Sequence, residues 1–194
     1  MFICAGKSEQ FDFALPVGIG LVDVATRLTQ HCIAQKPDFL CFVGTAGSYG
    51  EKAIFDIIES QHATQIEQSL IHATAYTPLE EIVKGISSLG GEAETDSLLF
   101  KNCNVSRETV VNSSNYITTN EAAGVWHRDR SIHLENMEFY AVVKVAQMFD
   151  IPAIGIFVVT NYCNEDAHKD FVKNQPKAME RLTEYMKQYL DQEL

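Results

Sequence analysis

The sequence predicts an α/β protein in which a central parallel or mixed sheet carries helices on both faces. Two apolar runs, 39–43 and 153–160, lack polar alternation, as is typical of strands that are covered on both sides. Segments with apolar residues three and four positions apart lie beside them, which is typical of helices packed on a sheet. The 194 residues suffice for one sizeable hydrophobic core, so we expect a single domain over residues 1–194.

The first third of the chain predicts a strand, a helix and a second strand. Residues 2–5 form a short apolar strand. The glycine turn 17–20 opens a helix of about four turns that ends before Pro37. Residues 39–43 predict the first buried strand, and the glycine loop 44–47 follows it.

The middle of the chain carries weaker patterns. Residues 54–59 and 65–73 are candidates for strands at the edge of the sheet. Residues 77–91 resemble a helix that starts with a proline and acids and ends at a glycine pair. Residues 108–111 resemble a short strand that leads into the polar loop 112–115.

The last third predicts three helices and one strand. Residues 121–130 form a short helix. Residues 134–149 predict a longer helix, because their apolar residues recur every three or four positions. Residues 153–160 are rich in β-branched side chains and predict a strand. Residues 166–194 predict a final helix that is interrupted near Pro176.

The composition excludes several classes of function. The formal net charge is −11 and the 15 lysines and arginines are scattered, so we expect no binding of nucleic acid. The five cysteines are odd in number and form no Cys-x-x-Cys pair, which favours reduced thiols. The six histidines lack zinc spacing, so no metal site is expected. No apolar run approaches the ~20 residues of a membrane helix and no signal-peptide pattern occurs, so we expect a cytoplasmic protein without a membrane segment.

Three predicted strand ends, at 44–47, 112–116 and 161–168, should meet at one edge of the sheet. Ligands of parallel α/β sheets bind outside the carboxyl ends of the strands, so we expect the site here. The loop 44–47 offers backbone amides and the Thr45 hydroxyl, which suit an anion or sugar hydroxyls. Glycines after a strand more often only permit the turn, and the glycines beside Ile19 are open to the same two interpretations.

Glu138 is the most informative residue of the predicted site. It falls on the apolar face of the helix predicted over 134–149, where a carboxylate must be paired or face a polar cavity. A salt bridge at a helix start and a cavity are equally compatible with the pattern. His168 is interpreted as a cap or surface histidine, and Ser113 and Ser114 lack the Gly-x-Ser-x-Gly context of an acyl-transfer nucleophile.

Four short motifs occur together along the chain. They are Val17-Gly18-Ile19-Gly20-Leu21-Val22, Val43-Gly44-Thr45-Ala46-Gly47, Glu135-Asn136-Met137-Glu138, and Val159-Thr160-Asn161 followed by Ala167-His168-x-x-Phe171. In this order and spacing they resemble the nucleoside phosphorylase-I superfamily, over roughly residues 15–190. That superfamily includes purine nucleoside phosphorylases, uridine phosphorylase and the methylthioadenosine/adenosylhomocysteine nucleosidases. The resemblance implies a three-layer α/β/α fold with a central mixed sheet, and a cleft in which an N-glycosidic bond is broken.

The resemblance implies a role for each matching residue. Met137 would pack under the ribose, Glu138 would accept hydrogen bonds from the ribose hydroxyls, and Tyr116 would stack on the base. Cleavage places positive charge on the ribose, which a carboxylate stabilises, and negative charge on the base, which needs a donor. Glu138 and Asn161 are therefore the expected catalytic residues. The other expected contacts are Ser114 with the substrate, and Gly18, Gly44, Thr45 and Gly47 with phosphate or water.

One departure from the family pattern concerns the base. In the nucleosidases and hexameric purine phosphorylases, the strand that matches 154–160 ends in Ser-Asp, and this Asp protonates the leaving purine. Here the position is Asn161, and an amide cannot act as a general acid, although it can hydrogen-bond the base. Trimeric purine phosphorylases carry Asn at the comparable place, which implies a preference for 6-oxopurine nucleosides.

A second departure concerns the nucleophile. Hexameric phosphorylases place an arginine just before the glycine loop, where this chain has Phe42. Phosphate would then depend on backbone amides and on Lys7, Arg27 or a side chain of a partner subunit. The nucleosidases position water with a glutamate after their first strand, and only Glu9 matches that position here. The segment before the glycine turn is also shorter than the family's usual hairpin.

The main prediction is a purine nucleoside phosphorylase of purine salvage, with inorganic phosphate as co-substrate and no cofactor. A nucleosidase that uses water and a nucleoside-binding protein that has lost catalysis are the alternatives, and chance resemblance in a structural α/β domain is a further one. Family members share sites between subunits, so we expect a homo-oligomer, with the aromatic surface near Trp126 as a candidate interface.

Overall fold

The computed structural model describes residues 1–79, 82–85 and 109–190. The strands are β1 (Phe2–Cys4), β2 (Leu15–Pro16), β3 (Leu40–Ser48), β4 (Ile57–Ser60), β5 (His62–Thr64), β6 (Ile82–Lys84), β7 (Val110–Ser113), β8 (Leu134–Asn136) and β9 (Ala153–Tyr162). The helices are α1 (Leu21–Gln35), α2 (Gln68–Ile71), α4 (Glu121–Arg128), α5 (Phe139–Met148) and α6 (Ala167–Leu190).

The long strands β3 and β9 form the centre of a mixed sheet. They pair in parallel from Leu40 opposite Ala153 to Ser48 opposite Tyr162. β3 also pairs in parallel with β1 at its start and antiparallel with β8 at its end. β7, β5 and β6 continue the sheet beyond β8, while β4 pairs antiparallel with β9. Because β3 touches β1, β8 and β9, it brings three distant parts of the chain to one place.

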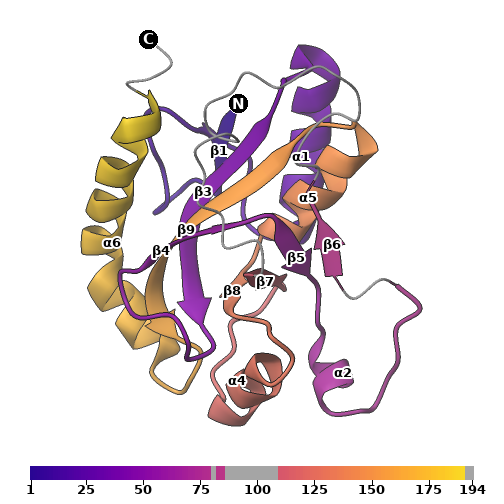
Figure 1. Cartoon of the computed structure of the whole chain (residues 1–194), viewed down its shortest axis with the longest axis vertical. Coiled ribbons are helices and arrows are strands. Elements are labelled where there is room, and N and C mark those ends of the chain that lie inside the picture. Colours follow the sequence, from indigo (N-terminus) through magenta and orange to yellow (C-terminus); the bar gives the residue numbers. More distant parts are fainter. Residues whose placement is uncertain (80–81, 86–108, 191–194) are drawn as a thin grey trace.

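Helices cover both faces of this sheet. Figure 1 shows α6 on one side of β3 and β9, and α1 with α5 on the other. Alternate β3 side chains point to opposite faces, so Leu40 and Phe42 join the core under α1 and α5, whereas Cys41 and Val43 join the core under α6. The predicted three-layer α/β/α class with a mixed central sheet is therefore confirmed.

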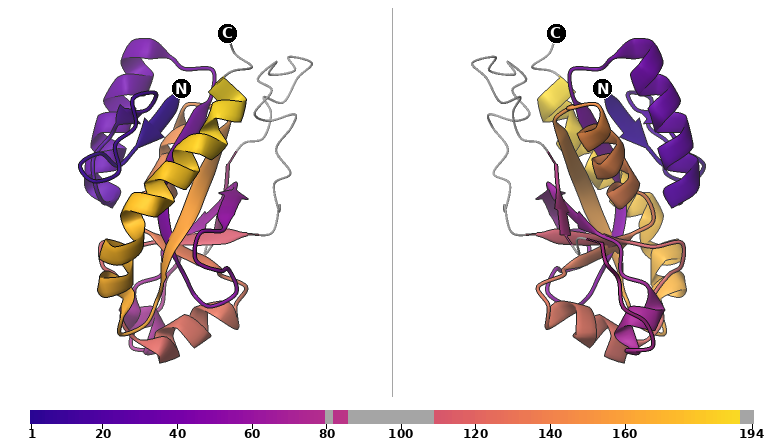
Figure 2. Two further views of the ribbon diagram at one scale, coloured as in Figure 1. Left: turned by 90° about the vertical axis from the view of Figure 1, so that its left-hand side faces the viewer. Right: turned by 90° about the vertical axis from the view of Figure 1, so that its right-hand side faces the viewer.

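The side views in Figure 2 show α4 at the end of the molecule toward which β3 runs. Its first residue follows the cap Asn120, whose side-chain oxygen accepts hydrogen bonds from the N–H groups of Ala122 and Ala123. The short helix predicted over 121–130 is thus confirmed. Among the described helices, none combines the length and the apolarity that crossing a bilayer requires. Cys4, Cys32, Cys41 and Cys163 are buried, while Cys103 lies outside the described ranges.

The predicted helix over 134–149 is wrong in its first part. Leu134–Asn136 is the strand β8, which pairs with β7 on one side and with β3 on the other, and α5 starts only at Phe139. A strand of three residues joined directly to a helix leaves the three-to-four spacing of apolar residues intact, so the two cannot be separated by periodicity.

The glycine segment 44–47 was predicted to be a loop, and this prediction is wrong because the segment belongs to β3. These residues are held in the strand by backbone pairing with β9 and β8, which a run of glycines in the sequence does not indicate. The prediction for the last helix is also wrong in one respect, because α6 continues through Pro176 without interruption. The carbonyl that a proline at 176 leaves unpaired belongs to Val172, which lies on an exposed part of the helix where water can bind it.

The weak patterns in the middle of the chain gave mixed results. Within 54–59 the structure has β4, but the predicted strand over 65–73 is wrong, since α2 lies there. The predicted helix over 77–91 is wrong at Ile82–Lys84, which form β6 beside β5, while residues 80–81 and 86–91 lie outside the described ranges. The strand predicted over 108–111 appears as β7, displaced by two residues.

Candidate functional site

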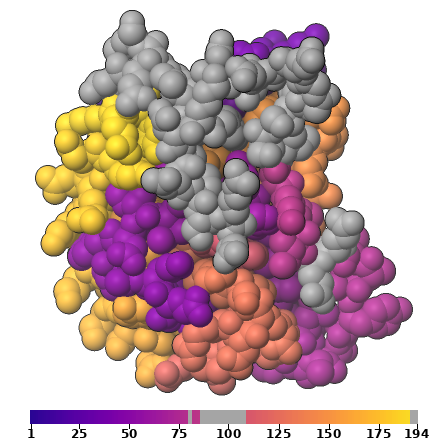
Figure 3. Space-filling view, viewed as in Figure 1, coloured from indigo at the N-terminus to yellow at the C-terminus, as the bar shows by residue number. Residues whose placement is uncertain are grey.

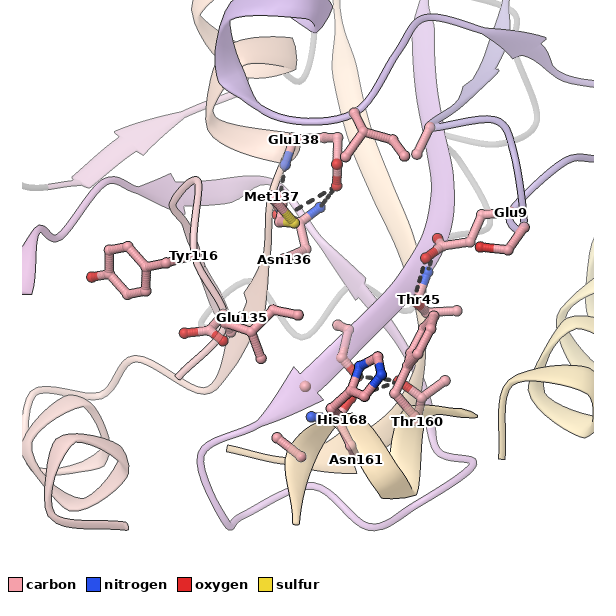
Figure 4. A pocket seen from close by; sticks show the side chains of 18 of the residues that line it. Glu9, Thr45, Tyr116, Glu135, Asn136, Met137, Glu138, Thr160, Asn161 and His168 are labelled. Carbon is pink, nitrogen blue, oxygen red and sulfur yellow. Dashed lines mark hydrogen bonds between the residues drawn. The ribbon is translucent and has the colours of Figure 1, made fainter. Parts of the chain in front are cut away.

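A cavity of about 270 Å³ opens where β3, β8 and β9 end. Its wall comes from the turn after β1, the second half of β3, the loop after β7, the junction of β8 and α5, and the start of α6. Figure 4 shows the polar side chains of these elements around one space. The strand ends expected to form the site therefore do meet, with β8 and the β1 turn added to them.

The side chain of Glu9 is bound to Thr45 by two hydrogen bonds. The backbone N–H of Thr45 donates to Oε2 of Glu9 at 2.8 Å, and the Thr45 hydroxyl donates to Oε1 at 2.7 Å. Gly6 and Glu9 pair through their backbones, which closes the turn after β1 and directs Glu9 toward β3. Burial raises the pKa of the Glu9 carboxyl, and the two bonds from Thr45 oppose that rise.

Glu138 is the residue just before α5, and its carboxylate lies on the cavity wall. Oε1 accepts a hydrogen bond from the Gly20 N–H at 3.0 Å, while Oε2 accepts from the Met137 N–H at 3.1 Å and from Nδ2 of Asn136 at 3.3 Å. Burial and the nearby charge of Glu9 raise the pKa of Glu138 to about 7, although the bonds from Gly20 and Met137 oppose that rise. Of the two interpretations left open by the sequence, the structure shows the polar cavity.

Asn136 fixes the bend between β8 and α5. Its Oδ1 accepts from the Ser113 hydroxyl at 2.7 Å and from the backbone N–H groups of Glu138 and Phe139. Asn136 therefore satisfies donors at the start of α5 and, through its Nδ2, also binds the Glu138 carboxylate. Met137, between the two, lines the cavity.

Glu135 is a third carboxylate on the cavity wall, and both of its oxygens accept hydrogen bonds. The hydroxyl of Tyr49 donates to Oε2 at 2.9 Å, the backbone N–H of Thr118 donates to Oε1 at 2.8 Å, and the Thr118 hydroxyl also donates to Oε2. Burial raises the pKa of Glu135, against these bonds. The residue ties the loop after β7 to the end of β3, because Tyr49 follows β3 directly.

Asn161 closes the cavity at the end of β9. Its Oδ1 accepts from the Thr160 hydroxyl at 2.9 Å and its Nδ2 donates to the Tyr162 carbonyl at 3.1 Å. His168, the second residue of α6, also lines the cavity and is exposed to solvent. Figure 4 shows its ring in the part of the site formed by Thr160 and Asn161.

Tyr116 and Ser114 lie in the loop after β7. The Tyr116 hydroxyl donates to the Ile66 carbonyl at 2.7 Å, and burial raises the pKa of Tyr116 to about 12. Tyr116 lines the cavity, but Figure 4 shows its ring extending away from Met137 and Asn161. Ser114 is buried, donates to the Tyr116 carbonyl and does not line the cavity. In this conformation Ser114 shapes the loop, and Ile117 is the apolar side chain of the loop beside Tyr116 on the wall.

The glycines predicted to bind an anion make room for side chains. A Cβ on Gly44 would come within 3.0 Å of Glu9 Oε2, and a Cβ on Gly47 would come within 3.0 Å of Asn161 Nδ2. Gly47 lines the cavity, whereas Gly44 and Gly18 do not. Gly20, with φ of 83°, gives its N–H to Glu138, so the glycine turn before α1 contributes a donor to the site through a residue next to the predicted one.

Two residues of the site were missed from the sequence as binding residues, Glu135 and Asn136. Both stand in the motif that carries Met137 and Glu138, so their position was visible. Assigning residues 134–149 to one helix hid them, because a helix would turn them toward different faces. Glu9 was noticed only as a possible water ligand, since its contact with Thr45 spans 36 positions and leaves no local signal.

Residues 13–191 match the phosphorylase superfamily, and the chain therefore belongs to that superfamily. A curated relative is the 5′-methylthioadenosine/S-adenosylhomocysteine nucleosidase of Haemophilus ducreyi, which is 25% identical over 182 residues, with 88% of this chain and 75% of the relative covered. The predicted superfamily is thereby confirmed.

Solved structures with the same fold include two Helicobacter pylori proteins. One is a mutant of the nucleosidase MTAN with 5′-methylthioadenosine in the active site, which has a TM-score of 0.78 and 16% identity over 98% of this chain and 97% of that one. The other is a futalosine hydrolase mutant with a TM-score of 0.76 and 16% identity over the same shares of both chains. At these identities the likeness shows a shared fold.

The prediction of a purine nucleoside phosphorylase is wrong. The relatives are nucleosidases and a futalosine hydrolase, which agrees with the nucleosidase alternative and not with a transferase. The preference for 6-oxopurines loses its basis as well, because it rested on the analogy with phosphorylases. A physical reason is visible at Thr45, whose two donors were expected to hold phosphate and are bound to Glu9.

Proposed function

We propose that this chain hydrolyses the N-glycosidic bond of a purine nucleoside, with water as the nucleophile. The observation that carries the proposal is the carboxylate of Glu9, which occupies both donors of Thr45 at the place where a phosphorylase would need them for its anion. The relatives named as nucleosidases support the same reaction and suggest a nucleoside such as 5′-methylthioadenosine as the kind of substrate.

The charges on the cavity wall favour water over phosphate. Glu9, Glu135 and Glu138 line the cavity, and its described lining contains no lysine or arginine. A phosphate dianion would therefore meet like charges on this wall, where no lysine or arginine among the described lining residues offsets them. Water carries no charge and needs only an acceptor for its proton.

Glu9 is the acceptor suited to that proton. Thr45 holds the Glu9 carboxylate in a fixed orientation at the cavity, and burial raises the pKa of Glu9, which makes it a stronger base than an exposed carboxylate. We assign Glu9 as the general base that takes a proton from water as the water oxygen attacks C1′ of the ribose.

Glu138 and Met137 serve the sugar in this scheme. The Glu138 carboxylate accepts hydrogen bonds from the ribose hydroxyls and stabilises the positive charge that develops on the ribosyl ring. Gly20, Met137 and Asn136 hold the carboxylate in place before substrate arrives, so little reorganisation is needed. Asn161 hydrogen-bonds the base at the other end of the cavity.

Product analysis tests this proposal directly. We expect the wild-type chain to release free base and free sugar from 5′-methylthioadenosine or another purine nucleoside at a rate that does not change when inorganic phosphate is added. Glu9→Gln should lower kcat by about 100-fold or more, because the amide cannot take the proton from water. The matched control is Glu180→Gln, the same exchange at an exposed position of α6, which should keep the wild-type rate.

Two outcomes would contradict the proposal. A sugar 1-phosphate as product, formed only with phosphate present, would make the chain a phosphorylase after all. Tight binding of purine nucleosides without any turnover would instead support the nucleoside-binding alternative.

A further inference from the structure

We propose that His168 is the catalytic residue that protonates the leaving purine. The inference rests on the proposed hydrolysis, for which no general acid has been assigned above. When the bond between C1′ and the purine nitrogen breaks, both bonding electrons stay on the base. A purine anion is a poor leaving group, so a donor that supplies a proton in the transition state lowers the barrier.

Asn161 cannot supply this proton, although it stands at the base end of the cavity. An amide has no proton that it gives up near neutral pH. The amide is also held in place, since its oxygen accepts from Thr160 and its nitrogen donates to the Tyr162 carbonyl. Asn161 can orient the base, but the acid must come from another side chain.

The three carboxylates of the cavity are all committed to other partners. Glu9 is bound through both oxygens to Thr45 and faces the nucleophile. Glu138 is bound through both oxygens to Gly20, Met137 and Asn136. Glu135 accepts three hydrogen bonds, from the Tyr49 hydroxyl and from the N–H and hydroxyl of Thr118, which tie it to the loop after β7.

Two titratable side chains remain among the described lining residues, Tyr116 and His168. The Tyr116 hydroxyl donates to the Ile66 carbonyl and its ring extends away from Asn161, which leaves His168 to move a proton between solvent and base. It lines the same cavity as Asn161 and Thr160, and Figure 4 shows its ring at this end of the site. The ring is exposed and, within the described parts of the chain, makes no hydrogen bond, so it is free to turn toward a ligand and to be reprotonated by water. Imidazole is the side chain that exchanges protons around neutral pH.

The proton balance of the step closes with these two residues. The imidazolium of His168 gives its proton to the purine as the C1′–N bond breaks, and becomes neutral imidazole. Water adds to C1′ and gives its proton to Glu9. The products are neutral base and free sugar, and the proton on Glu9 returns to His168 through solvent.

Substrates that differ only in their need for a proton test the proposal. A purine nucleoside methylated at N7 carries a positive base and leaves as a neutral molecule, and 4-nitrophenyl riboside leaves as a stable phenolate. We expect His168→Gln to lower kcat on the parent nucleoside by about 100-fold, while the rate on the two activated substrates changes by less than about threefold. His72→Gln, at an exposed histidine outside the cavity, is the matched control and should leave both rates unchanged.

Three results would overturn the assignment. Equal losses on parent and activated substrates in His168→Gln, with an unchanged thermal midpoint, would show that His168 holds the substrate instead of protonating it. An unchanged rate on the parent nucleoside would show that His168 takes no part. His168→Asn serves as a second variant and should give the same selectivity, whereas a wild-type chain that cleaves no nucleoside would refute the hydrolysis itself.

Discussion

Glu138 combines the catalytic role proposed for it with an energetic cost that a change of pH can reveal. Its side chain is 6% exposed, and burial followed by the charge of Glu9 raises its pKa from 4.5 to about 7. Between these two pH values the folded chain keeps a proton that the unfolded chain has released. The free energy of unfolding therefore falls as pH rises through this window, because ionised Glu138 is less stable inside the fold than in water.

This linkage gives a prediction for Glu138→Gln. The part of the fall in unfolding free energy between pH 4.5 and 7 that belongs to Glu138 should disappear, since glutamine does not titrate. Urea unfolding of both proteins across this range measures the difference. In the wild type, kcat/KM should rise as the pH passes through about 7, because the ionised form of Glu138 then becomes available to the ribosyl cation. The variant should lose about 100-fold or more in kcat/KM, and a similar pH slope of stability in both proteins would contradict the assignment.

At the level of residues, the sequence predicted what local chemistry can show. Thr45, Met137, Glu138 and Asn161 all line one cavity, as expected from their motifs. The reason for the glycines could not be predicted, because the space at Gly44 is filled by the Phe42 ring together with Glu9, and Glu9 is far away in sequence. The amide donors of a glycine segment look the same in sequence whether a ligand or a carboxylate of the same chain binds them.

At the level of elements, α4 shows how a helix can support the site although none of its residues lines the cavity. His127 of α4 stacks on Tyr49 with ring centroids 4.1 Å apart and planes 2° from parallel. Tyr49 in turn donates to Glu135, which holds Thr118 in the loop after β7. Burial lowers the pKa of His127 to about 4, so the ring is neutral in this stack at physiological pH.

The cap of α4 is open to a simple test. Asn120→Ala removes the acceptor for the N–H groups of Ala122 and Ala123 and should lower the free energy of unfolding by about 1 kcal/mol. Asn120→Asp keeps a side-chain oxygen at the same place and should stay close to wild type. Urea unfolding at constant pH checks both, and equal stability of the alanine variant and the wild type would contradict the capping role.

Elements with a strong pattern were predicted well and short ones were not. Three long elements stand out in the sequence, namely the strands β3 and β9 and the helix α1. The strands are continuous apolar runs, and the helix repeats apolar residues every three or four positions over several turns. β5, β6 and β8 have three residues each, which is too few for a period to appear. Their structure comes from pairing with neighbours, and so only the folded sheet defines them.

At the level of the whole molecule, two cores on opposite faces of the sheet hold the strand ends in register. The core under α6 contains Ile154, Ile156 and Val158 of β9 together with Leu182 and Met186 of α6. The surface view in Figure 3 shows α6 along one side of the molecule and α4 at its lower edge. The position of Asn161 and His168 depends on this packing, because they end β9 and begin α6.

A substitution at Leu182 measures how much the core under α6 contributes to the free energy of unfolding. Its side chain is fully buried, so Leu182→Ala should cost about 2–5 kcal/mol of unfolding free energy through lost burial and the cavity left behind. Leu79→Ala makes the same exchange at a side chain that is 66% exposed and should change stability by no more than about 0.5 kcal/mol. Thermal or urea unfolding compares the pair. Similar losses in both variants would show that α6 is not packed as described.

The three carboxylates around the cavity also determine what kind of molecule would inhibit this chain. A nucleoside is neutral and gains little from Glu9 and Glu138 until its sugar becomes cationic during cleavage. A sugar analogue with an amine in the ring carries that charge from the outset. Such an analogue would bind more tightly than the substrate, and because Glu138 has a pKa of about 7, its binding near neutral pH would release a proton from the cavity to the buffer.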